Sequence, residues 1–353
     1  MKFSICIPNY NYERYLGSTI QSILDQDYQD LEVLVSDNAS TDGSQALVRG
    51  IGDPRVQLHV NTCNVGFAGN LDRSARMASG DTMIMLSSDD QMRPGALSTY
   101  AKLIECLGSR AQKVIASSSW DIIDAQDAVI DQTGPDRTLW LEADRQPAAE
   151  QTLGCAVYGV AGREMLRRCL QQMKNPFNFA ATMYATQLYR QVEGYGGGRL
   201  FNPDKWFHWR VLAEADMAYW VDRRLFAYRW HTSNQVSQEG AIGALKFLVD
   251  EYVSTLELDR GLLEQIGLSR DDVTDAFIEH DIGRHGLATL ARGQRVRARQ
   301  ILDFGRATYP NHLRRNRKVL ALRALLALGP VGQRVARRAY RSYQRASSSH
   351  DGQ

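Results

Sequence analysis

The chain has few cysteines, few prolines and no long apolar run. The five cysteines are scattered and form no Cys-x-x-Cys pair: Cys6, Cys63, Cys106, Cys155 and Cys169. This scatter, with an odd number that leaves at least one cysteine unpaired, favours a reducing compartment. The longest apolar stretch, residues 319–331, contains Arg323 and Pro330 and is shorter than the ~20 residues of a membrane-spanning helix. We therefore expect a soluble or peripheral protein.

Acidic residues are almost absent from one part of the chain. Residues 284–345 carry 16 Lys and Arg but a single acid, Asp303, whereas residues 1–283 carry 26 basic and 38 acidic side chains. Residues 1–283 therefore carry a net charge of −12 and residues 284–345 one of +15. With −1 from Asp351 in the tail, the formal net charge of the chain is +2. This asymmetry predicts a negatively charged partner for the basic part.

The first 120 residues alternate strand and helix patterns. Apolar runs at residues 3–7, 31–35 and 81–86 are separated by segments with helical spacing. Such alternation predicts an α/β fold with a doubly wound, mostly parallel sheet flanked by helices. From about Ala241 the spacing is helical throughout, and Ser269 with the acid three residues later predicts a capping box.

Polar segments follow three of the predicted strands, at residues 8–11, 36–42 and 87–90. Ligands bind at the carboxyl ends of the strands in sheets of this kind, so these segments are expected to converge. They are rich in Asp, Asn and Ser, which suits a polar ligand and a hard cation. The sequence thus predicts a cleft of carboxylates and amides at this edge.

Four motifs in the same order resemble glycosyltransferase family 2, whose members have the GT-A fold and move a sugar from a nucleotide sugar to an acceptor with inversion. They are SICIPNYN at 4–11, SDNASTDGS at 36–44, NVG at 64–66 and MLSSDD at 85–90. The resemblance covers about residues 1–237.

The resemblance implies a Rossmann-like GT-A catalytic domain over residues 1–237, with a nucleotide-sugar-binding half at 1–120 and an acceptor and catalytic half at 121–237. The rest of the chain is expected to be an α-helical C-terminal region. Residues 238–346 form this helical region, which is basic from residue 284, and residues 347–353 are expected to be a flexible tail.

In the family, the first two motifs hold the donor nucleotide. The donor nucleotide-binding residues implied here are Pro8, Asn9, Tyr10, Asn11, Asp37, Asn38 and Ser88. Asp37 takes the position of the aspartate that accepts from the base N3–H, which uracil and thymine have and cytosine lacks. The resemblance therefore implies a UDP- or dTDP-sugar. The alternative for Asp37 is an ordinary Asx turn with Asn38.

The acidic motif and a later histidine are implied as a Mn²⁺ or Mg²⁺ site. Asp89 and His231 match the metal ligands, while Asp90 and Arg229 match the diphosphate and second-shell positions. The family's usual Asp-x-Asp is altered here because Ser87 replaces the first acid. The alternative is that the two adjacent acids only cap a helix.

Asp204 matches the family's catalytic aspartate, with Pro203 in place of the usual glutamate. A carboxylate at this position is expected to deprotonate the acceptor hydroxyl as general base. A helix N-cap is the alternative role for Asp204, because Asp precedes a helical segment there.

The basic end combines leucine and valine with arginine over residues 311–345. This composition predicts an amphipathic helix that contacts an anionic membrane surface. The alternatives are a helix that packs its leucines on the rest of the chain or self-associates, and nucleic-acid binding. No nucleic-acid motif accompanies the arginines, so no nucleic acid is expected as partner.

The resemblance implies an inverting, metal-dependent glycosyltransferase for hexosyl or deoxyhexosyl transfer. The expected acceptor is a hydroxyl of a glycan or a lipid-linked molecule, in the synthesis of cell-surface polysaccharide or lipopolysaccharide. The expected location is the cytoplasm, peripheral at the inner face of the cell membrane. The alternatives are a nucleotide-sugar-binding scaffold without turnover, or a nucleotidylyltransferase.

Overall fold

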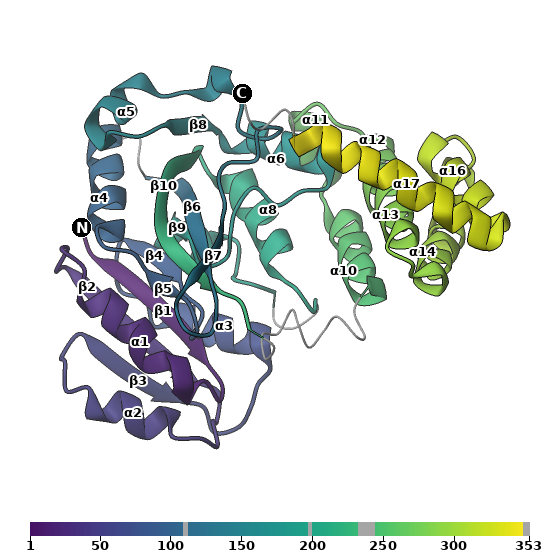
Figure 1. The fold of residues 1–353 in the computed structure, drawn as a ribbon. Helices are drawn as coiled ribbons and strands as arrows, with labels where there is room; N and C mark the ends of the chain where they lie inside the picture. The colour runs from purple at the N-terminus through teal and green to yellow at the C-terminus, as the bar shows by residue number, and fades with distance from the viewer. Residues whose placement is uncertain (109–111, 197–199, 232–243, 349–353) are drawn as a thin grey trace. The chain divides into compact units, whose positions relative to one another are not determined.

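The structure is a computed structural model that describes residues 1–108, 112–196, 200–231 and 244–348 (Figure 1). Its contacts divide the chain into two compact units. The N-terminal unit comprises Met1–Cys169 and Asn175–Gln238, and the C-terminal unit comprises Leu170–Lys174 and Glu239–Gln353.

The N-terminal unit is built on one mixed sheet. In the described residues its main path has the order β3-β2-β1-β4-β9-β6-β10-β5, with β7 beside β6 and β8 beside β10. The strands are β1 (Phe3–Asn9), β2 (Leu31–Asp37), β3 (Val56–Val60), β4 (Thr82–Met85), β5 (Gln91–Met92), β6 (Val114–Ile123), β7 (Val129–Gln132), β8 (Val157–Ala161), β9 (Thr182–Ala185) and β10 (Met217–Arg229).

Parallel pairing connects β1 with β2 and β4, β2 with β3, and β6 with β10. The short strand β9 is antiparallel to both of its neighbours, β4 and β6. Strands β5 and β8 pair antiparallel with β10, and β7 pairs antiparallel with β6. The predicted α/β fold with a mostly parallel core is confirmed, and antiparallel strands are added to it.

Amphipathic helices flank this sheet and place an apolar stripe against it. In α1, for example, Leu16, Ile20 and Ile23 are fully buried in the same core as the β1 residues Ile5 and Ile7. The helices are α1 (Glu13–Leu24), α2 (Ser44–Gly50), α3 (Phe67–Arg76), α4 (Ala96–Leu107), α5 (Pro147–Leu153), α6 (Gly162–Gln172), α7 (Thr186–Gln191) and α8 (Asp204–Glu214), with a 3₁₀ turn at Glu142–Asp144.

The described part of the C-terminal unit is helical, as predicted. Its helices are α10 (Ala244–Glu257), α11 (Arg260–Gln265), α12 (Arg270–Phe277), α13 (His285–Ala291), α14 (Arg295–Thr308), α15 (Pro310–Leu313), α16 (Arg317–Ala327) and α17 (Gly329–Ser348), with a π-helical segment at Ile278–Arg284. Among the described residues, no helix has the length and hydropathy needed to cross a membrane.

Local signals set the helix boundaries in this unit. The predicted capping box is confirmed, because Ser269 Oγ accepts from the Asp272 amide and the Asp272 side chain accepts from the Ser269 amide. The Asn316 side chain caps α16, so this helix begins at Arg317. Helix α17 extends to Ser348, so the tail predicted from residue 347 begins inside it, and 349–353 lie outside the described residues.

Candidate functional site

The three polar segments meet at the carboxyl edge of the parallel strands, as predicted. Asn9 ends β1 directly beside Asp37, which ends β2. Beyond β4, the Leu86 amide donates to the Cys6 carbonyl at 2.9 Å. Ser88 Oγ then donates to the Pro8 carbonyl at 2.9 Å. These contacts bring residues 8–11, 36–42 and 87–90 into one site.

Asp37 is fully buried between its neighbours. Its Oδ1 accepts from the Ser40 amide and from Gln45 Nε2, each at 2.9 Å, and its Oδ2 accepts from Asn9 Nδ2 at 2.8 Å. A carboxylate can accept about four hydrogen bonds, so one acceptor position remains on Oδ2. Asn9 Oδ1 is also buried, without a hydrogen-bond partner. Among the residues that the structure describes, two acceptor positions at this strand edge therefore have no donor.

The Ser40 amide, three residues along the chain, donates to Asp37 Oδ1, whereas the expected Asx turn would use the amide two residues along. This bond occupies only one of the acceptor positions of the carboxylate. The local turn and a contact with a ligand are therefore compatible.

Asn38 holds the neighbouring loop in place. Its Nδ2 donates to Asn64 Oδ1 at 2.8 Å, and its Oδ1 accepts from the Val65 amide at 2.9 Å and from Asn61 Nδ2 at 3.1 Å. Asn61 in turn bonds to Asn70 of α3. The predicted nucleotide contact of Asn38 stays a prediction, since the described structure uses its amide to position residues 64–66.

The first motif reaches the surface after Asn9. Tyr10 is 43% exposed. Asn11 has a φ of 58°, which Asn tolerates better than most residues. Its amide donates to Ser40 Oγ at 3.0 Å, and its Oδ1 accepts from the Thr41 amide at 2.8 Å. The exposed ring of Tyr10 therefore lies on a turn in which the next residue, Asn11, is held by hydrogen bonds to Ser40 and Thr41.

Asp89 and His231 lie together although 142 positions separate them in the chain. His231 Nε2 is 2.9 Å from Asp89 Oδ2, and both residues are largely buried. The ring of His231 packs against Tyr15 at a centroid distance of 5.0 Å and against Tyr12 at 6.1 Å. The structure thus brings together the two predicted metal ligands.

One carboxylate and one imidazole are donors that Mn²⁺ accepts. Among the described residues, no cluster of three or more His, Cys, Asp or Glu side chains gathers in a way that could hold a metal ion. A cation held by this pair alone would need further oxygen ligands from water or a bound molecule. Next to the pair, burial and then the charge of Asp89 raise the pKa of Asp90 well above its ordinary value.

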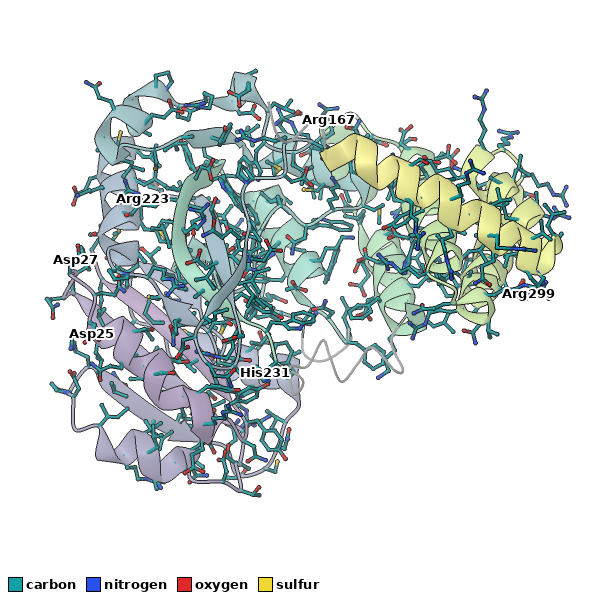
Figure 2. All side chains as sticks on the ribbon, in the orientation of Figure 1. Asp25, Asp27, Arg167, Arg223, His231 and Arg299 are labelled. Atoms are coloured by element: carbon teal, nitrogen blue, oxygen red, sulfur yellow. The ribbon has the colours of Figure 1, made fainter. Side chains whose placement is uncertain are left out.

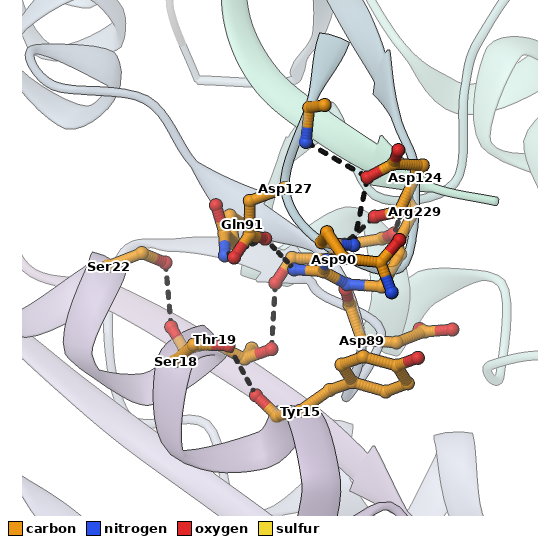
Figure 3. Close-up of polar contacts among 12 residues, drawn as sticks. Tyr15, Ser18, Thr19, Ser22, Asp89, Asp90, Gln91, Asp124, Asp127 and Arg229 are labelled. Atoms are coloured by element: carbon orange, nitrogen blue, oxygen red, sulfur yellow. Dashed lines mark hydrogen bonds and ion pairs between the residues drawn. The ribbon is translucent and has the colours of Figure 1, made fainter. Parts of the chain in front are cut away.

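Arg229 is a buried arginine that bonds to the backbone next to this pair. Its side chain is 1% exposed; Nε donates to the Asp89 carbonyl at 2.8 Å, and Nη1 donates to the Asp124 carbonyl at 2.9 Å (Figure 3). Nη2 forms an ion pair with Asp127. These contacts hold the backbone at Asp89 and Asp124, and the predicted role of Arg229 at a diphosphate stays a prediction. The Arg229 amide also donates to Asp90 Oδ1 at 2.9 Å.

Two residues of α1 belong to the site although no motif contains them. Thr19 Oγ1 bonds to the carbonyls of Ser88 and Asp90, at 2.9 and 2.8 Å. The Tyr15 ring lies 4.7 Å from the Arg229 guanidinium carbon, in addition to its contact with His231, and Figure 3 shows it beside Asp89 and Arg229. Helix α1 therefore holds the backbone of the Asp89 loop through Thr19 and contacts Arg229 and His231 through Tyr15.

If Asp89 and His231 hold Mn²⁺, replacing Tyr15 by Leu is expected to weaken Mn²⁺ binding about tenfold, because the ring's contacts with Arg229 and His231 are lost. Tyr15→Phe keeps the ring and is expected to behave as the unmodified chain. Metal titrations of both variants check this. Equal metal dependence of the Leu and Phe variants would show that the ring does not position the pair.

Asp204 is the first residue of α8, after Pro203 at the N-cap position. The N-cap alternative is therefore wrong, because Pro203 and not Asp204 occupies the N-cap position. A carboxylate in the first turn still interacts favourably with the helix dipole. Asp204 is partly buried close to Tyr195. Burial and then Tyr184 raise the pKa of Tyr195 well above its ordinary value, and the charge of Asp204 adds to this.

Helix α3 links the surroundings of Asp204 to the strand-end loops. Its Asn70 donates to the Ser36 carbonyl at 2.9 Å. Its Asp72, further along the helix, accepts from the Tyr195 amide at 2.7 Å and from the Tyr189 hydroxyl at 2.9 Å. A single rigid element thus contacts both the β2 edge and the aromatic cluster beside α8.

Comparison with known proteins identifies the N-terminal motifs. The family model described as Glycosyl transferase family 2 matches residues 4–112. An uncharacterized glycosyltransferase of Nostoc is 31% identical over 37% of this chain and 40% of its own length. The GalNAc(5)-diNAcBac-PP-undecaprenol beta-1,3-glucosyltransferase of Campylobacter jejuni is 36% identical over 28% of this chain and 33% of its own length. The matched part spans two fifths or less of these relatives.

Solved structures resemble the chain over most of its length. TarS 1–349 of S. aureus, solved in complex with UDP-GlcNAc, has a TM-score of 0.64 at 17% identity, over 97% of this chain and 92% of its own. The mannosyltransferase PcManGT of Pyrobaculum calidifontis, in complex with GDP-Man and Mn²⁺, has a TM-score of 0.50 at 17% identity, over 100% and 88%. At these identities the likeness shows a shared GT-A-like fold.

Proposed function

We propose that this chain, which belongs to glycosyltransferase family 2 through its residues 4–112, transfers a sugar from a UDP- or dTDP-sugar to a hydroxyl of a glycan or lipid-linked acceptor. The observation that carries the proposal is the pairing of two features at adjoining strand ends. Asp37 and Asn9 offer hydrogen-bond acceptors there, and Asp89 lies 2.9 Å from His231.

The remaining acceptor position of Asp37 suits a uracil or thymine base. These bases have an N3–H donor, whereas cytosine has an acceptor at N3, which the carboxylate would repel. A fully buried carboxylate discriminates strongly, because an unmatched polar group in such a site is costly. The exposed ring of Tyr10 is proposed to cover the nucleotide, with Pro8, Asn11, Asn38 and Ser88 around it.

Asp89 and His231 are proposed to hold Mn²⁺ or Mg²⁺. Such an ion supplies Lewis-acid charge that offsets the negative charge developing on a diphosphate leaving group. Arg229 and Thr19 keep the backbone of the Asp89 loop fixed. Asp90 and Arg229 lie behind the metal ligands, so we assign them a supporting role at the diphosphate side.

Asp204 is proposed as the general base of an inverting displacement. The acceptor oxygen bonds to the anomeric carbon while the bond from that carbon to the diphosphate oxygen breaks. The hydroxyl proton moves to the Asp204 carboxylate. The position of Asp204 at the start of α8, beside the cluster that Asp72 of α3 contacts, supports this assignment.

The acceptor is inferred from the relatives. The matched protein of Campylobacter jejuni is named for an acceptor linked to undecaprenol through a diphosphate. We propose a similar lipid-linked acceptor, used at the inner face of the cell membrane in the synthesis of surface polysaccharide or lipopolysaccharide.

Titration calorimetry with free nucleotides in the presence of Mn²⁺ tests the donor site. We expect UDP to bind at least about tenfold more tightly than CDP, because Asp37 accepts from the N3–H that CDP lacks. Asp37→Asn is expected to abolish this preference, since the amide can also donate to cytosine N3. Equal binding of UDP and CDP by the unmodified chain would contradict the assignment of Asp37.

A further inference from the structure

Helices α16 and α17 carry large aliphatic side chains that point away from the packed interior of the C-terminal unit. In this pair of helices and the residue between them, Leu320 is 45% exposed, Leu328 58%, Val331 52% and Val335 50%. About half of the surface of each side chain is therefore in water, where single exposed aliphatic residues are common but a group on adjacent turns is not.

The exposed group is distinct from the residues that pack the helices. In α16 the buried side chains are Val319, Leu322 and Leu326. In α17 the positions Gly332 and Ala336 are buried, and they lie about 100° around the helix from the exposed Val331 and Val335. The exposed aliphatic side chains are therefore different residues from those that pack the two helices.

Arginines border these exposed aliphatic side chains. Arg337 of α17 is exposed but donates to the Ala291 carbonyl at 3.3 Å. The other exposed arginines among the described side chains of the two helices are Arg317, Arg323, Arg334, Arg338 and Arg341. Within the described residues, no acidic side chain forms an ion pair with any of these five; the ion pair of α16 is made by Lys318 with Glu279. We call Leu320, Leu328, Val331, Val335 and these five arginines the outer face of α16–α17.

We propose that the outer face of α16–α17 docks on an anionic lipid bilayer. The aliphatic side chains would enter the region between the headgroups, and the guanidinium groups would bind lipid phosphates. This inference locates the membrane contact on named residues and does not depend on sugar transfer, so each can fail without the other.

Charge and composition favour lipid over the other occupants. A second copy of the same face would bring unpaired arginines against arginines, which repel each other. Nucleic acid would use the arginines but gains little from exposed leucine and valine, and it favours aromatic side chains for stacking. A lipid bilayer with anionic headgroups and an apolar interior matches both the arginines and the exposed aliphatic side chains.

Co-sedimentation of the full chain with vesicles tests the charged half. We expect binding to vesicles of phosphatidylcholine with one third phosphatidylglycerol and none to pure phosphatidylcholine. The double variant R334Q/R338Q is expected to bind about 25-fold more weakly, because each arginine near the surface contributes about fivefold. R292Q/R299Q removes the same charge from exposed arginines outside the face and should leave binding unchanged (Arg299 is labelled in Figure 2).

A second pair of variants tests the contribution of the exposed aliphatic side chains. V331S/V335S is expected to weaken vesicle binding about tenfold by removing apolar surface from the contact. Val296 is 76% exposed on α14, and V296S makes the same chemical change elsewhere in the unit. It should bind as the unmodified chain does. Sedimentation equilibrium and a titration with duplex DNA complete the experiment.

Three results would overturn the proposal. One is equal binding to neutral and anionic vesicles. Another is equal loss of vesicle binding in R334Q/R338Q and R292Q/R299Q, which would indicate a general charge effect. The third is a chain that ignores vesicles while the outer-face substitutions change its oligomeric state or its DNA binding.

Discussion

Replacing Asp204 by Asn is expected to lower the turnover number by a factor of about 10² to 10⁴, because the amide cannot take the proton of the acceptor hydroxyl. The donor is held by other residues, so its KM should change little. The same substitution removes a negative charge from the first turn of α8, which costs only about 0.3–1 kcal/mol of folding free energy. The loss of activity is therefore expected in a folded protein.

The matched control for this prediction is Asp216→Asn, an exposed acid two residues beyond the end of α8. It changes the net charge equally and should retain full turnover. Steady-state kinetics of both variants, with the thermal midpoint as a check on folding, separate the two. A D204N enzyme that keeps more than a tenth of the turnover number would exclude Asp204 as the general base.

Asp89→Asn is expected to abolish measurable Mn²⁺ binding in the presence of UDP and to lower kcat/KM about 10³-fold. The substitution removes the charge that would hold the cation and replaces an anionic ligand atom by a neutral one. It also changes the partner of His231 Nε2, which lies 2.9 Å from Asp89. Paramagnetic resonance of free Mn²⁺ measures binding without any turnover.

Asp131→Asn serves as the control, because Asp131 is an exposed acid on β7. It should bind Mn²⁺ and turn over donor as the unmodified chain does. Retention of tight Mn²⁺ binding by D89N would mean that the cation, if used at all, is held elsewhere.

The strand-end loops could be predicted because two local patterns agree. Apolar runs such as residues 3–7 and 31–35 mark buried parallel strands, and such strands align their carboxyl ends at one edge. The contact between Asn9 and Asp37 follows from this rule alone. Ser88 follows in the same way, since it comes soon after β4, the other neighbour of β1.

The rest of the site depends on contacts between segments that are distant in the sequence. No local sequence pattern predicts such contacts. Tyr15 and Thr19 occupy apolar-face positions of an ordinary amphipathic helix, so their roles as partners of Arg229 and of the Ser88 carbonyl were not visible in the sequence. Asn61 and Asn70 were missed for the same reason. The pairing of Asp89 with His231 was expected only through the family resemblance.

The sheet shows a similar limit. Strand β9 spans only Thr182–Ala185, too short to give a clear period, yet it lies between β4 and β6. Its insertion separates the two parallel parts of the sheet, and both of its pairings are antiparallel. Helix boundaries in the C-terminal unit were more predictable, because Ser269 and Asp272 form the cap that their spacing suggests.

The most direct test of the account is the release of nucleotide diphosphate from a panel of UDP- and dTDP-sugars, with Mn²⁺, a lipid-linked acceptor and the unmodified chain. We predict release from at least one donor, and losses in D204N and D89N of at least about 10²-fold. A chain that binds UDP but releases none from any donor would contradict the account. So would release that both substitutions leave unchanged.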